Sequence, residues 1–369
     1  MGTTDILVIG GGIIGASVAY GVAERGVRVA LLDQGGSAPN ASRGNFGLAW
    51  VQGKGLGMPR YAEWSLEAAQ AWPEFATHLR EQTGISTDYL RPGGFEVCLG
   101  EKAWKAREAS IVQMRRESAT GTCDCEMLDR QAMQERIPKL RLGEAVSGAS
   151  FSPHDGHLNS LALLTALLAA NQKIGVVHHP EQPVKSVSFQ KGSFEVRTST
   201  KHFSAQKVVL ACGLGIKPLA RQVGLEIPIR PQRGQILVTE RTHPLLEQPF
   251  VTIRQTQEGS FLFGASHEEV GFDTGTTLEE MRRLAGHAVQ VFPELARLQL
   301  VRCWGALRIL TPDTKPVYVE SESCPGAFVV TSHSGITLAP LHAQRLSEWI
   351  VEGVAPDGFE QFHSRRFDA

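Results

Sequence analysis

The sequence predicts two domains: a discontinuous, Rossmann-like α/β domain, and an antiparallel-sheet domain of α+β class inserted into it. Three observations predict this fold. The 369 residues are about twice a typical domain. A strand, a glycine turn, a helix and a second strand open the chain, and related patterns recur in its middle and near its end. Stretches that alternate like antiparallel strands lie between them.

The domain boundaries follow from where each kind of pattern occurs. Residues 1–85, 145–222 and 310–369 carry the parallel-sheet patterns and are assigned to the discontinuous domain. Residues 86–144 and 223–309 are assigned to the inserted domain. We see no internal repeat and no low-complexity segment that would suggest another architecture.

The elements of the opening unit follow one another closely. An apolar, β-branched run at 5–9 predicts a buried strand, and 13–25 a helix that ends at Gly26. A second buried strand is predicted at 27–32. Residues 35–60 are rich in Gly, Ser and Asn and predict a long loop, a length that is unusual unless the loop is functional.

Later elements are predicted from helical periodicity and from alternation. Helices are expected at 61–83, 102–118, 159–170, 278–291 and 336–351. Strands are expected at 173–178, within 184–210, within 231–265 and at 328–331.

Composition excludes several classes of protein. With 42 % hydrophobic and 20 % charged residues, the chain can bury a large core and is not intrinsically disordered. A net charge of −1 gives no reason to expect nucleic acid or an anionic membrane as a partner. No apolar run reaches the roughly 18 residues of a membrane span, and no signal-peptide pattern occurs. We therefore expect a cytoplasmic protein without a transmembrane segment, whose membrane association, if any, is through partner subunits.

The six cysteines show no C-x-x-C spacing, so no metal site is assigned. Cys123 and Cys125 lie two residues apart in a polar stretch, and a metal role there stays open as the less favoured alternative. Reduced, structural thiols are the simpler interpretation for a cytoplasmic protein.

The opening glycines predict a dinucleotide site. Gly10, Gly12 and Gly15 form G-x-G-x-x-G between a strand and a helix, which allows a tight turn, close approach of a pyrophosphate and close packing of the helix. Asp33 ends the second strand, 18 residues after Gly15, where it can accept hydrogen bonds from a ribose. To this site we also assign Ile13, Ile14 and Gln34. The motif alone does not distinguish an FAD site from an NAD site, nor a glycine turn that binds a cofactor from one that binds none.

Six further motifs follow in a fixed order. They are 41–47 (ASRGNFG), 183–184 (PV), 208–213 (VVLACG), 231–235 (PQRGQ), 304–308 (WGALR) with 311–313 (TPD) and Pro316, and 332–340 (SHSGITLAP). Small residues and exposed N–H groups in the first suit an anion or a ring edge, although ordinary surface loops share this composition. A Ser–His nucleophile in the last is disfavoured, because no G-x-S-x-G elbow occurs.

With these motifs the chain resembles the D-amino acid oxidase-like flavoproteins, the family of glycine oxidase and sarcosine oxidase, over nearly its whole length. The resemblance implies an FAD-binding domain with an inserted substrate domain, and oxidation of the C–N bond of an amino or imino acid by hydride transfer to flavin N5. It also implies non-covalent FAD, because the cysteine that tethers FAD in sarcosine oxidase-like members has no counterpart in 307–311. Leu262 stands near the position of a lysine thought to help oxygen react, so slow reaction with oxygen is expected.

The resemblance also implies site residues. Beyond the opening turn, flavin contacts are expected from Ala41, Ser42, Asn45, Gly47, Leu48, Val184, Ala211, Cys212, Gly213, Arg308, Gly335, Ile336 and Thr337. Arg308 matches the arginine that holds the substrate carboxylate in glycine oxidase, a role that suits a permanently charged, bidentate donor. Its alternative is a structural salt bridge. His333 and Arg254 are the other substrate-binding candidates; no catalytic acid or base is assigned, and His267 is a candidate only.

Two details resemble one branch of the family. The 332–340 motif lacks two residues of the usual form, and Arg254 is followed by Gln255 where glycine oxidase has an aliphatic residue and proline. Both resemble the β subunits of heteromeric dehydrogenases: opine and nopaline oxidases, hydrogen cyanide synthase and D-hydroxyproline dehydrogenase. The branch implies an α subunit and a small iron–sulfur subunit as partners, and a D-hydroxyproline- or opine-like substrate.

Three other functions stay open at this point. The chain could be a free-standing amino acid oxidase that produces hydrogen peroxide, an NAD-dependent dehydrogenase, or a non-catalytic flavoprotein scaffold subunit.

Overall fold

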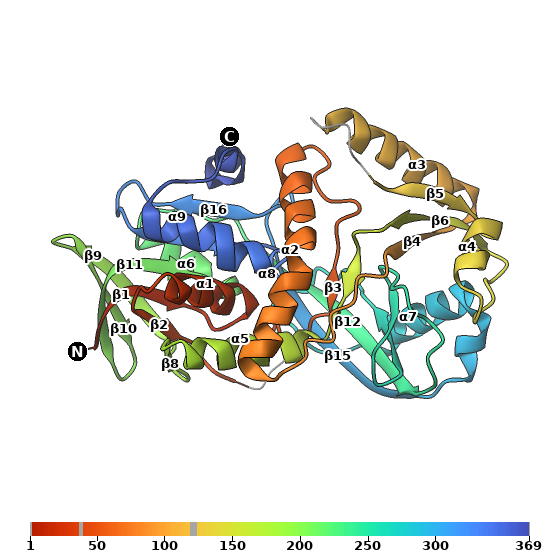
Figure 1. Ribbon diagram of the computed structural model, residues 1–369, viewed down its shortest axis with the longest axis horizontal. Helices are drawn as coiled ribbons and strands as arrows, with labels where there is room; N and C mark the ends of the chain where they lie inside the picture. The colour runs from red at the N-terminus through yellow and green to blue at the C-terminus, as the bar shows by residue number, and fades with distance from the viewer. Residues whose placement is uncertain (1, 37–39, 119–123, 369) are drawn as a thin grey trace.

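The structure is a computed structural model that describes residues 2–36, 40–118 and 124–368. Two domains lie side by side along its longest axis (Figure 1). The long helix α2 (Pro59–Thr83) runs between them, and both ends of the chain lie in the domain on the left of the figure.

Within the described residues, the first domain is built on an eight-stranded sheet. Its strands are β1 (Gly2–Ile9), β2 (Val29–Leu32), β8 (Val177–His179), β9 (Val184–Gln190), β10 (Ser193–Thr198), β11 (His202–Leu210), β16 (Val317–Glu320) and β17 (Ala327–Thr331). The order β17–β11–β1–β2–β8 is parallel, while β16 pairs antiparallel with β17 and the β9–β10 hairpin pairs antiparallel with the first half of β11. β2 and β17 are buried along their whole length, as expected of strands covered on both faces.

Helices cover one face of this sheet and a mixed layer covers the other. α1 (Ile13–Glu24), α2 and α5 (Ser160–Lys173) lie on the first face, where Val8, Val18 and Trp64 share one buried core. α6 (Ile216–Arg221) and the β9–β10 hairpin cover the second face. α5 begins where the side chain of Asn159 accepts hydrogen bonds from two N–H groups of its first turn.

The C-terminal helix changes type along its length. It runs through α8 (Ala339–Leu341), a π-helical turn (His342–Leu346) and α9 (Ser347–Glu352). A Cβ atom on Gly21 of α1 would lie only 1.7 Å from the carbonyl oxygen of Ala343, so glycine is required for these helices to pack. Short 3₁₀ turns lie at Gly213–Gly215, Pro293–Arg297, Phe359–Phe362 and Ser364–Phe367.

The second domain is built on antiparallel strands. One sheet has the order β13–β14–β12–β15, and it contains β12 (Arg230–Arg241), β13 (Ile253–Gln255), β14 (Ser260–Gly264) and β15 (Leu300–Leu310). The other has the order β4–β6–β5, and it contains β4 (Gly94–Leu99), β5 (Glu126–Asp129) and β6 (Val146–Ser152). Backbone bonds between Phe95 and the 249–251 segment join the two. α3 (Gly100–Glu117), α4 (Arg130–Arg136) and α7 (Leu278–Val291) complete the domain.

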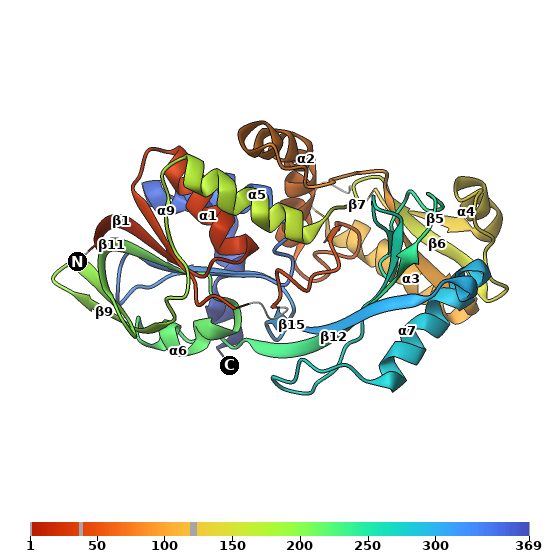
Figure 2. The ribbon, with the colours of Figure 1, turned by 90° about the horizontal axis from the view of Figure 1, so that it is seen from below.

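β12 and β15 extend from the boundary between the domains deep into the second one (Figure 2). The register puts Arg308 of β15 opposite Gln232 of β12, and Arg254 of β13 opposite Leu262 of β14. Because side chains alternate between the faces of a sheet, Arg308 and Arg254 share one face. That face meets the first domain, since Trp304 Nε1 donates to the carbonyl oxygen of Gly44 at 3.1 Å.

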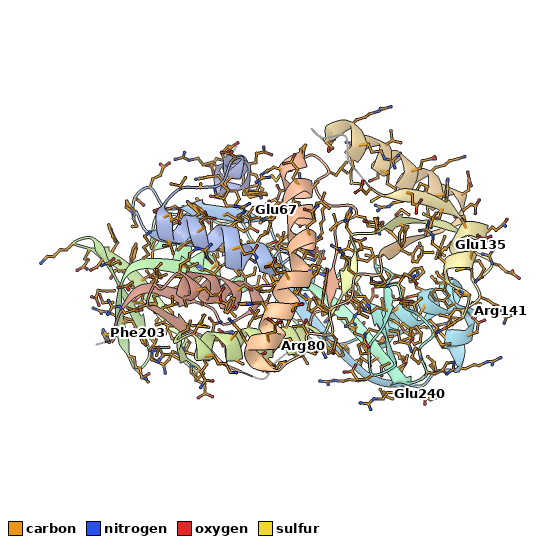
Figure 3. The ribbon with its side chains drawn as sticks, viewed as in Figure 1. Glu67, Arg80, Glu135, Arg141, Phe203 and Glu240 are labelled. Atoms are coloured by element: carbon orange, nitrogen blue, oxygen red, sulfur yellow. The ribbon has the colours of Figure 1, made fainter. Side chains whose placement is uncertain are left out.

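One side-chain pair on the surface connects two helices that are distant in sequence. Glu67 of α2 accepts a hydrogen bond at 3.0 Å from Arg345 of the C-terminal helix, on the side of α2 that Figure 3 shows. Phe203 on β11 lies at the opposite end of the molecule from Arg141 and Glu240 (Figure 3). Among the helices of the described residues, none has both the length and the apolar character of a membrane span.

The fold class predicted from the sequence is confirmed, and individual elements differ in detail. The strand expected at 173–178 was misplaced, because Lys173 ends α5 and β8 begins at Val177. The loop expected at 35–60 contains a short strand, β3 (Leu48–Ala49), which pairs with β7 (Gly156–His157). β4, β5, β6, β7, β15, β16, α4 and α6 were not predicted.

The domain boundaries stay a proposal. β6 lies within 145–222, which we had assigned to the first domain, yet it pairs with β4 and β5 of the second. We propose to move that boundary to the C-terminal side of Ser152.

Candidate active site

The glycine turn lies at the C-terminal end of β1. Gly10 has φ 114°, and a Cβ atom there would lie 2.5 Å from the carbonyl oxygen of Ala211. At Gly15 a Cβ atom would lie 1.9 Å from the carbonyl oxygen of Gly10. Gly12 is the N-cap residue of α1 and has no side chain that could cap the helix. The N–H of Ile13 donates to Ser42 Oγ at 3.0 Å. The turn is thus a cradle without side chains at a helix N-terminus, a place that suits an anion.

Asp33 is fixed beside this cradle. Its Oδ2 accepts a hydrogen bond from the N–H of Gly11 at 2.7 Å, and its Oδ1 accepts one from Gly35 at 2.8 Å. Each carboxylate oxygen keeps a second lone pair, which a diol could use. The N–H of Gln182 donates to the carbonyl oxygen of Asp33 at 2.7 Å, so the beginning of β9 with Val184 lies close by. Gln34, the next residue in the chain, is exposed.

The 41–48 loop joins the cradle to the second domain. Ser42 contacts the beginning of α1, as above, and Asn45 Oδ1 accepts a hydrogen bond from the N–H of Gly47 at 2.8 Å. Gly47 has φ 88°, and a Cβ atom there would lie 2.3 Å from the carbonyl oxygen of Leu158. Leu48 then begins β3. The predicted loop residues, Ala41 included, therefore lie between α1 and β7.

The 332–340 segment and the end of β11 complete the first half of the site. A Cβ atom on Gly335 would lie 3.0 Å from Ile14 Cγ1, and the N–H of Ala211 donates to the carbonyl oxygen of Ile9 at 2.8 Å. Thr337 Oγ1 accepts a hydrogen bond from the N–H of Trp50 at 3.0 Å. The structure brings the predicted cofactor residues from these segments together at the C-terminal ends of β1, β11 and β17; the others there are Cys212, Gly213 and Ile336.

Arg308 is half-buried and forms no ion pair within the described residues, although the charge of Glu268 acts on it from a longer distance. Its Nη1 donates to the carbonyl oxygens of Ser266 at 2.7 Å and of Arg233 at 3.3 Å. In the described part of the chain, no carboxylate lies within ion-pair distance of it, so the salt-bridge alternative is not supported. Burial lowers the pKa of Arg308 to about 10, which leaves the guanidinium charged at neutral pH.

Gln232 connects Arg308 with His267. Gln232 Oε1 lies 3.0 Å from His267 Nδ1 and 3.5 Å from Arg308 Nη1, and Gln232 Nε2 donates to Glu269. Because the amide oxygen only accepts, Nδ1 of His267 must carry a proton, and Nε2 of the neutral ring is an acceptor. Burial and the charge of Arg308 lower the pKa of His267.

The His333 side chain is exposed to solvent, yet many protein atoms surround it. This crowding, followed by the charges of Lys54, Arg308 and His267, lowers the pKa of His333 to about 3. His333 is therefore neutral at physiological pH.

Lys54 is a residue that sequence reasoning missed. Its Nζ donates to Ser334 Oγ at 2.5 Å and lies 5.7 Å from the ring centre of Tyr61. Ser334 Oγ also lies 2.6 Å from the hydroxyl of Tyr61. A single lysine in a loop rich in glycine was the only available sign in the sequence, and such lysines are usually solvated.

Arg254 is 5 % exposed and also lacks an acidic partner among the residues that the structure describes. Its Nε donates to the carbonyl oxygen of Phe46 at 2.5 Å, so it lies beneath the 41–48 loop. Burial lowers its pKa to about 10. His157 lies close enough for the charge of Arg254 to act on it, and burial together with this charge lowers the pKa of His157 to about 3.

A buried carboxylate, also missed, fixes the beginning of the loop that carries Lys54. Asp155 is 0 % exposed, and it accepts hydrogen bonds from the N–H groups of Val51 at 2.5 Å and Gln52 at 3.2 Å and from Gln52 Nε2 at 2.6 Å. Burial raises the pKa of Asp155 to about 7, although these donors act in the opposite direction.

No group of three or more His, Cys, Asp or Glu side chains within residues 2–36, 40–118 and 124–368 could hold a metal ion. Cys123, one of the pair considered for a metal, lies outside the described residues.

Comparison with known proteins decides the family. The model of the family DAO, FAD dependent oxidoreductase, matches residues 5–349. The chain belongs to this family of FAD-dependent oxidoreductases. As expected from the motifs, this flavoprotein binds FAD and acts on the C–N bond of amino acids.

Relatives of this flavoprotein include proteins named as subunits. It is 38 % identical over 365 residues to an opine oxidase subunit of Agrobacterium tumefaciens, an alignment that covers 99 % of this chain and 98 % of the relative. It is 26 % identical to the hydrogen cyanide synthase subunit HcnC of Pseudomonas aeruginosa, with 99 % and 96 % covered. The crystal structure of glycine oxidase from Geobacillus kaustophilus has the same fold, with a TM-score of 0.91, 24 % identity and 99 % of each chain covered.

Proposed function

We propose that this flavoprotein dehydrogenates an opine- or D-hydroxyproline-like amino or imino acid as the β subunit of a heteromeric complex. The observation that carries the proposal is Arg308, a charged guanidinium without an acidic partner in the described residues, on the sheet face that meets the cofactor motifs. A substrate carboxylate would give it the missing partner.

The residues present fit FAD. The cradle of Gly10, Gly12 and Gly15 has room for a pyrophosphate that a Cβ atom would fill, and Asp33 would bind the ribose. Val184 would contact the adenine through its backbone. The remaining proposed contacts would surround the phosphates and the ring; these are Ile13, Ile14, Gln34, Ala41, Ser42, Asn45, Gly47, Leu48, Ala211, Cys212, Gly213, Arg308, Gly335, Ile336 and Thr337. When bound, FAD supplies a ring that accepts a hydride at N5.

The bond to FAD would be non-covalent. The 307–311 stretch contains no cysteine, and Cys303 lies on the opposite face of the sheet from Arg308, 3.9 Å from Thr276 Oγ1. Burial raises the pKa of the Cys212 thiol to about 12, so it is not a nucleophile at neutral pH.

Arg308 would orient the substrate. Its Nε and Nη2 have no hydrogen-bond acceptor among the described residues, and they form the edge that binds a carboxylate with two parallel bonds. Held in this way, the Cα–H bond can be aimed at the flavin ring. His333 and Arg254 are the further proposed substrate contacts. The charges of Lys54 and Arg308 disfavour another cation nearby, so the substrate would bind as the neutral amine, and no catalytic base is required.

The proposed complex rests on relatives that are named as subunits of opine oxidase and of hydrogen cyanide synthase. It would contain an α subunit and a small iron–sulfur subunit, which would take the electrons.

One observation favours a second candidate, the free-standing oxidase. Arg254 lies directly opposite Leu262, so a cation stands on the same sheet face although the lysine of oxygen-reactive relatives is missing.

Anaerobic reduction of the yellow protein tests the function. We would mix it with D-hydroxyproline, D-proline, glycine, sarcosine and octopine, and follow the loss of flavin absorbance. One of these should bleach the flavin, and readmitted air should restore the colour slowly for a dehydrogenase and fast for an oxidase.

Variants identify the carboxylate anchor. Arg308→Ala should keep FAD and slow reduction about 30-fold or more, since losing one partner of a buried charge pair costs about 2–5 kcal/mol. Arg302→Ala is the matched control, because Arg302 lies on the same face of β15 but is exposed. An unchanged rate of flavin reduction in Arg308→Ala would contradict the proposed binding of the substrate carboxylate by Arg308.

A further inference from the structure

The site contains a second cation, Lys54, to which the proposed function gives no contact with the substrate. Lys54 reaches Ser334, the neighbour of His333, and its charge acts on the His333 ring together with that of Arg308. Like Arg308, Lys54 forms no ion pair with any carboxylate of the described ranges. Two positive charges therefore act on one neutral imidazole.

The contacts of Lys54 leave part of its bonding capacity unused. An ammonium group has three N–H donors, and Ser334 accepts one. The ring of Tyr61 stabilises the charge through its face but accepts no strong hydrogen bond. Ser334 already has the Tyr61 hydroxyl as a partner, so lysine is not needed to satisfy that serine. A partly buried cation of this kind is expected to gain most from an anion.

The position of Lys54 is defined by the loop that carries it. Asp155 holds the backbone of Val51 and Gln52 on one side. On the other side Gly55, with φ 84°, packs so closely on α2 that a Cβ atom would lie 2.5 Å from Ala62. A lysine between two such anchors is held in position, as expected of a binding residue.

We propose that Lys54 binds a second carboxylate of the substrate, carried on the arm attached to its nitrogen, while Arg308 binds the first. The substrate class is then an N-(carboxyalkyl) amino acid, a secondary amine with two carboxylates. This inference rests on the proposed function and narrows it, because D-hydroxyproline has one carboxylate and an opine has the second on its nitrogen arm.

The reaction on such a substrate balances with the activity already described. The carbon next to the carboxylate at Arg308 loses a hydride to the flavin, the nitrogen loses its proton, and a C=N bond forms. Water then adds to that carbon and the C–N bond breaks, which gives a 2-oxo acid and an amine that keeps the second carboxylate.

A matched pair of amines tests the inference. Iminodiacetate and N-(carbamoylmethyl)glycine have the same size and one identical carboxylate, and they differ only in the charge of the second arm. Flavin reduction is measured anaerobically against the concentration of each. The wild-type protein should be half-saturated by iminodiacetate at a concentration at least tenfold lower than by the carbamoyl compound. Lys54→Met should remove this preference, because it should weaken the binding of iminodiacetate far more than that of the carbamoyl compound. Lys54→Arg should restore part of it.

Lys315→Met is the control variant, since Lys315 lies near Gly57 at the end of the same loop and has no proposed contact with the substrate. A second readout requires no turnover: glutarate should perturb the visible spectrum of bound FAD at lower concentration than glutaramate, and Lys54→Met should abolish the difference.

The outcomes separate the inference from the function on which it rests. If both amines reduce the wild type equally well, or if Lys54→Met weakens both alike, the inference is overturned and the proposed function stands. If no amine or amino acid reduces the flavin, the proposed function fails, and the inference fails with it.

Discussion

The guanidinium of Arg308 lies against the α-carbon of Gly234 on the neighbouring strand. A Cβ atom on Gly234 would lie 2.6 Å from Nη2 and 2.7 Å from Cζ of Arg308. Gly234 has no positive φ, so its backbone would accept alanine. The glycine of the 231–235 motif is thus needed for the position of Arg308 rather than for a turn.

Gly234→Ala should therefore displace Arg308 and leave the fold intact. We expect unchanged FAD content and a concentration for half-maximal flavin reduction that rises by about tenfold or more, since a shift of roughly 1 Å in a positioning group has large kinetic effects. Flavin absorbance and anaerobic reduction with the best substrate measure both. Gly286→Ala, at an exposed helix position where nothing lies within 4 Å of the new Cβ, is the control. Normal kinetics in Gly234→Ala would show that Arg308 does not need this position.

Gly15→Ala should abolish FAD binding. The added methyl group would lie 1.9 Å from the carbonyl oxygen of Gly10, which is backbone, and 3.3 Å from Cβ of Ala211. We expect protein without bound flavin, or no folded protein, whereas Gly286→Ala should be as stable as the wild type or up to ~1 kcal/mol more stable. The ratio of flavin to protein absorbance measures the first effect and thermal unfolding the second. Full flavin content in Gly15→Ala would contradict the role of the glycine cradle.

Asp155 should make the protein less stable as the pH rises. Its pKa is 3.8 in the unfolded chain and about 7 in the folded one, so between these values the folded state binds a proton that the unfolded state has lost. Stability from this group is full below about pH 4 and is lost as the pH rises to about 7, by an amount on the order of a few kcal/mol.

Asp155→Asn should remove that part of the pH dependence. Denaturant unfolding at pH 5 and pH 8 should show a smaller difference between the two pH values in the variant than in the wild type. Because only the change in stability between the two pH values is compared, any pH-independent cost of placing an amide beside Gln52 cancels. An equal change in the variant and the wild type would mean that Asp155 stays ionised throughout, held so by its three N–H donors.

Arg233 should matter for stability rather than for substrate. It is 3 % exposed and forms ion pairs with Glu268 at 2.7 Å and with Asp273. Arg233→Met would leave Glu268 without its cation and should cost about 3 kcal/mol of unfolding free energy. Adding Glu268→Gln should recover part of this loss, because the uncompensated charge is then removed. A double variant less stable than the single one would argue against the ion pair as the cause.

The sequence predicted those features of the fold that depend on residues close together in the chain. The cradle depends on three glycines and a helix within one short stretch, so its position and its role could be predicted together. β15 was not predicted as a strand because one of its faces mixes Arg302 and Arg308 with apolar residues, and its pairing with β12 makes it a strand. β6 contains Gly and Ser where β-branched residues are usual, and it too depends on its neighbours for its conformation.

The same reasoning explains which site residues were found. Arg308 was identified because its motif resembles that of known flavoproteins, not because an isolated arginine indicates a carboxylate. Lys54 and Asp155 could not be found, since the significance of each depends on partners about a hundred residues or more away, Ser334 and Gln52 respectively. The lack of an acidic partner, which makes both Lys54 and Arg308 informative, is visible only in three dimensions.

The division of the first domain among distant segments has a consequence for its synthesis. β17 takes its place beside β11 only after residue 331 has been made, and the tight packing of α1 needs Ala343. A ribosome releases the chain from its N-terminus at about 5–20 residues per second. The first domain therefore cannot complete its fold until nearly the whole chain has emerged. Until then the apolar side chains of β1 and α1 lack the partners that β17 and the C-terminal helix supply. A cell that expresses this chain at high level should therefore show aggregation that chaperones relieve more effectively than added flavin.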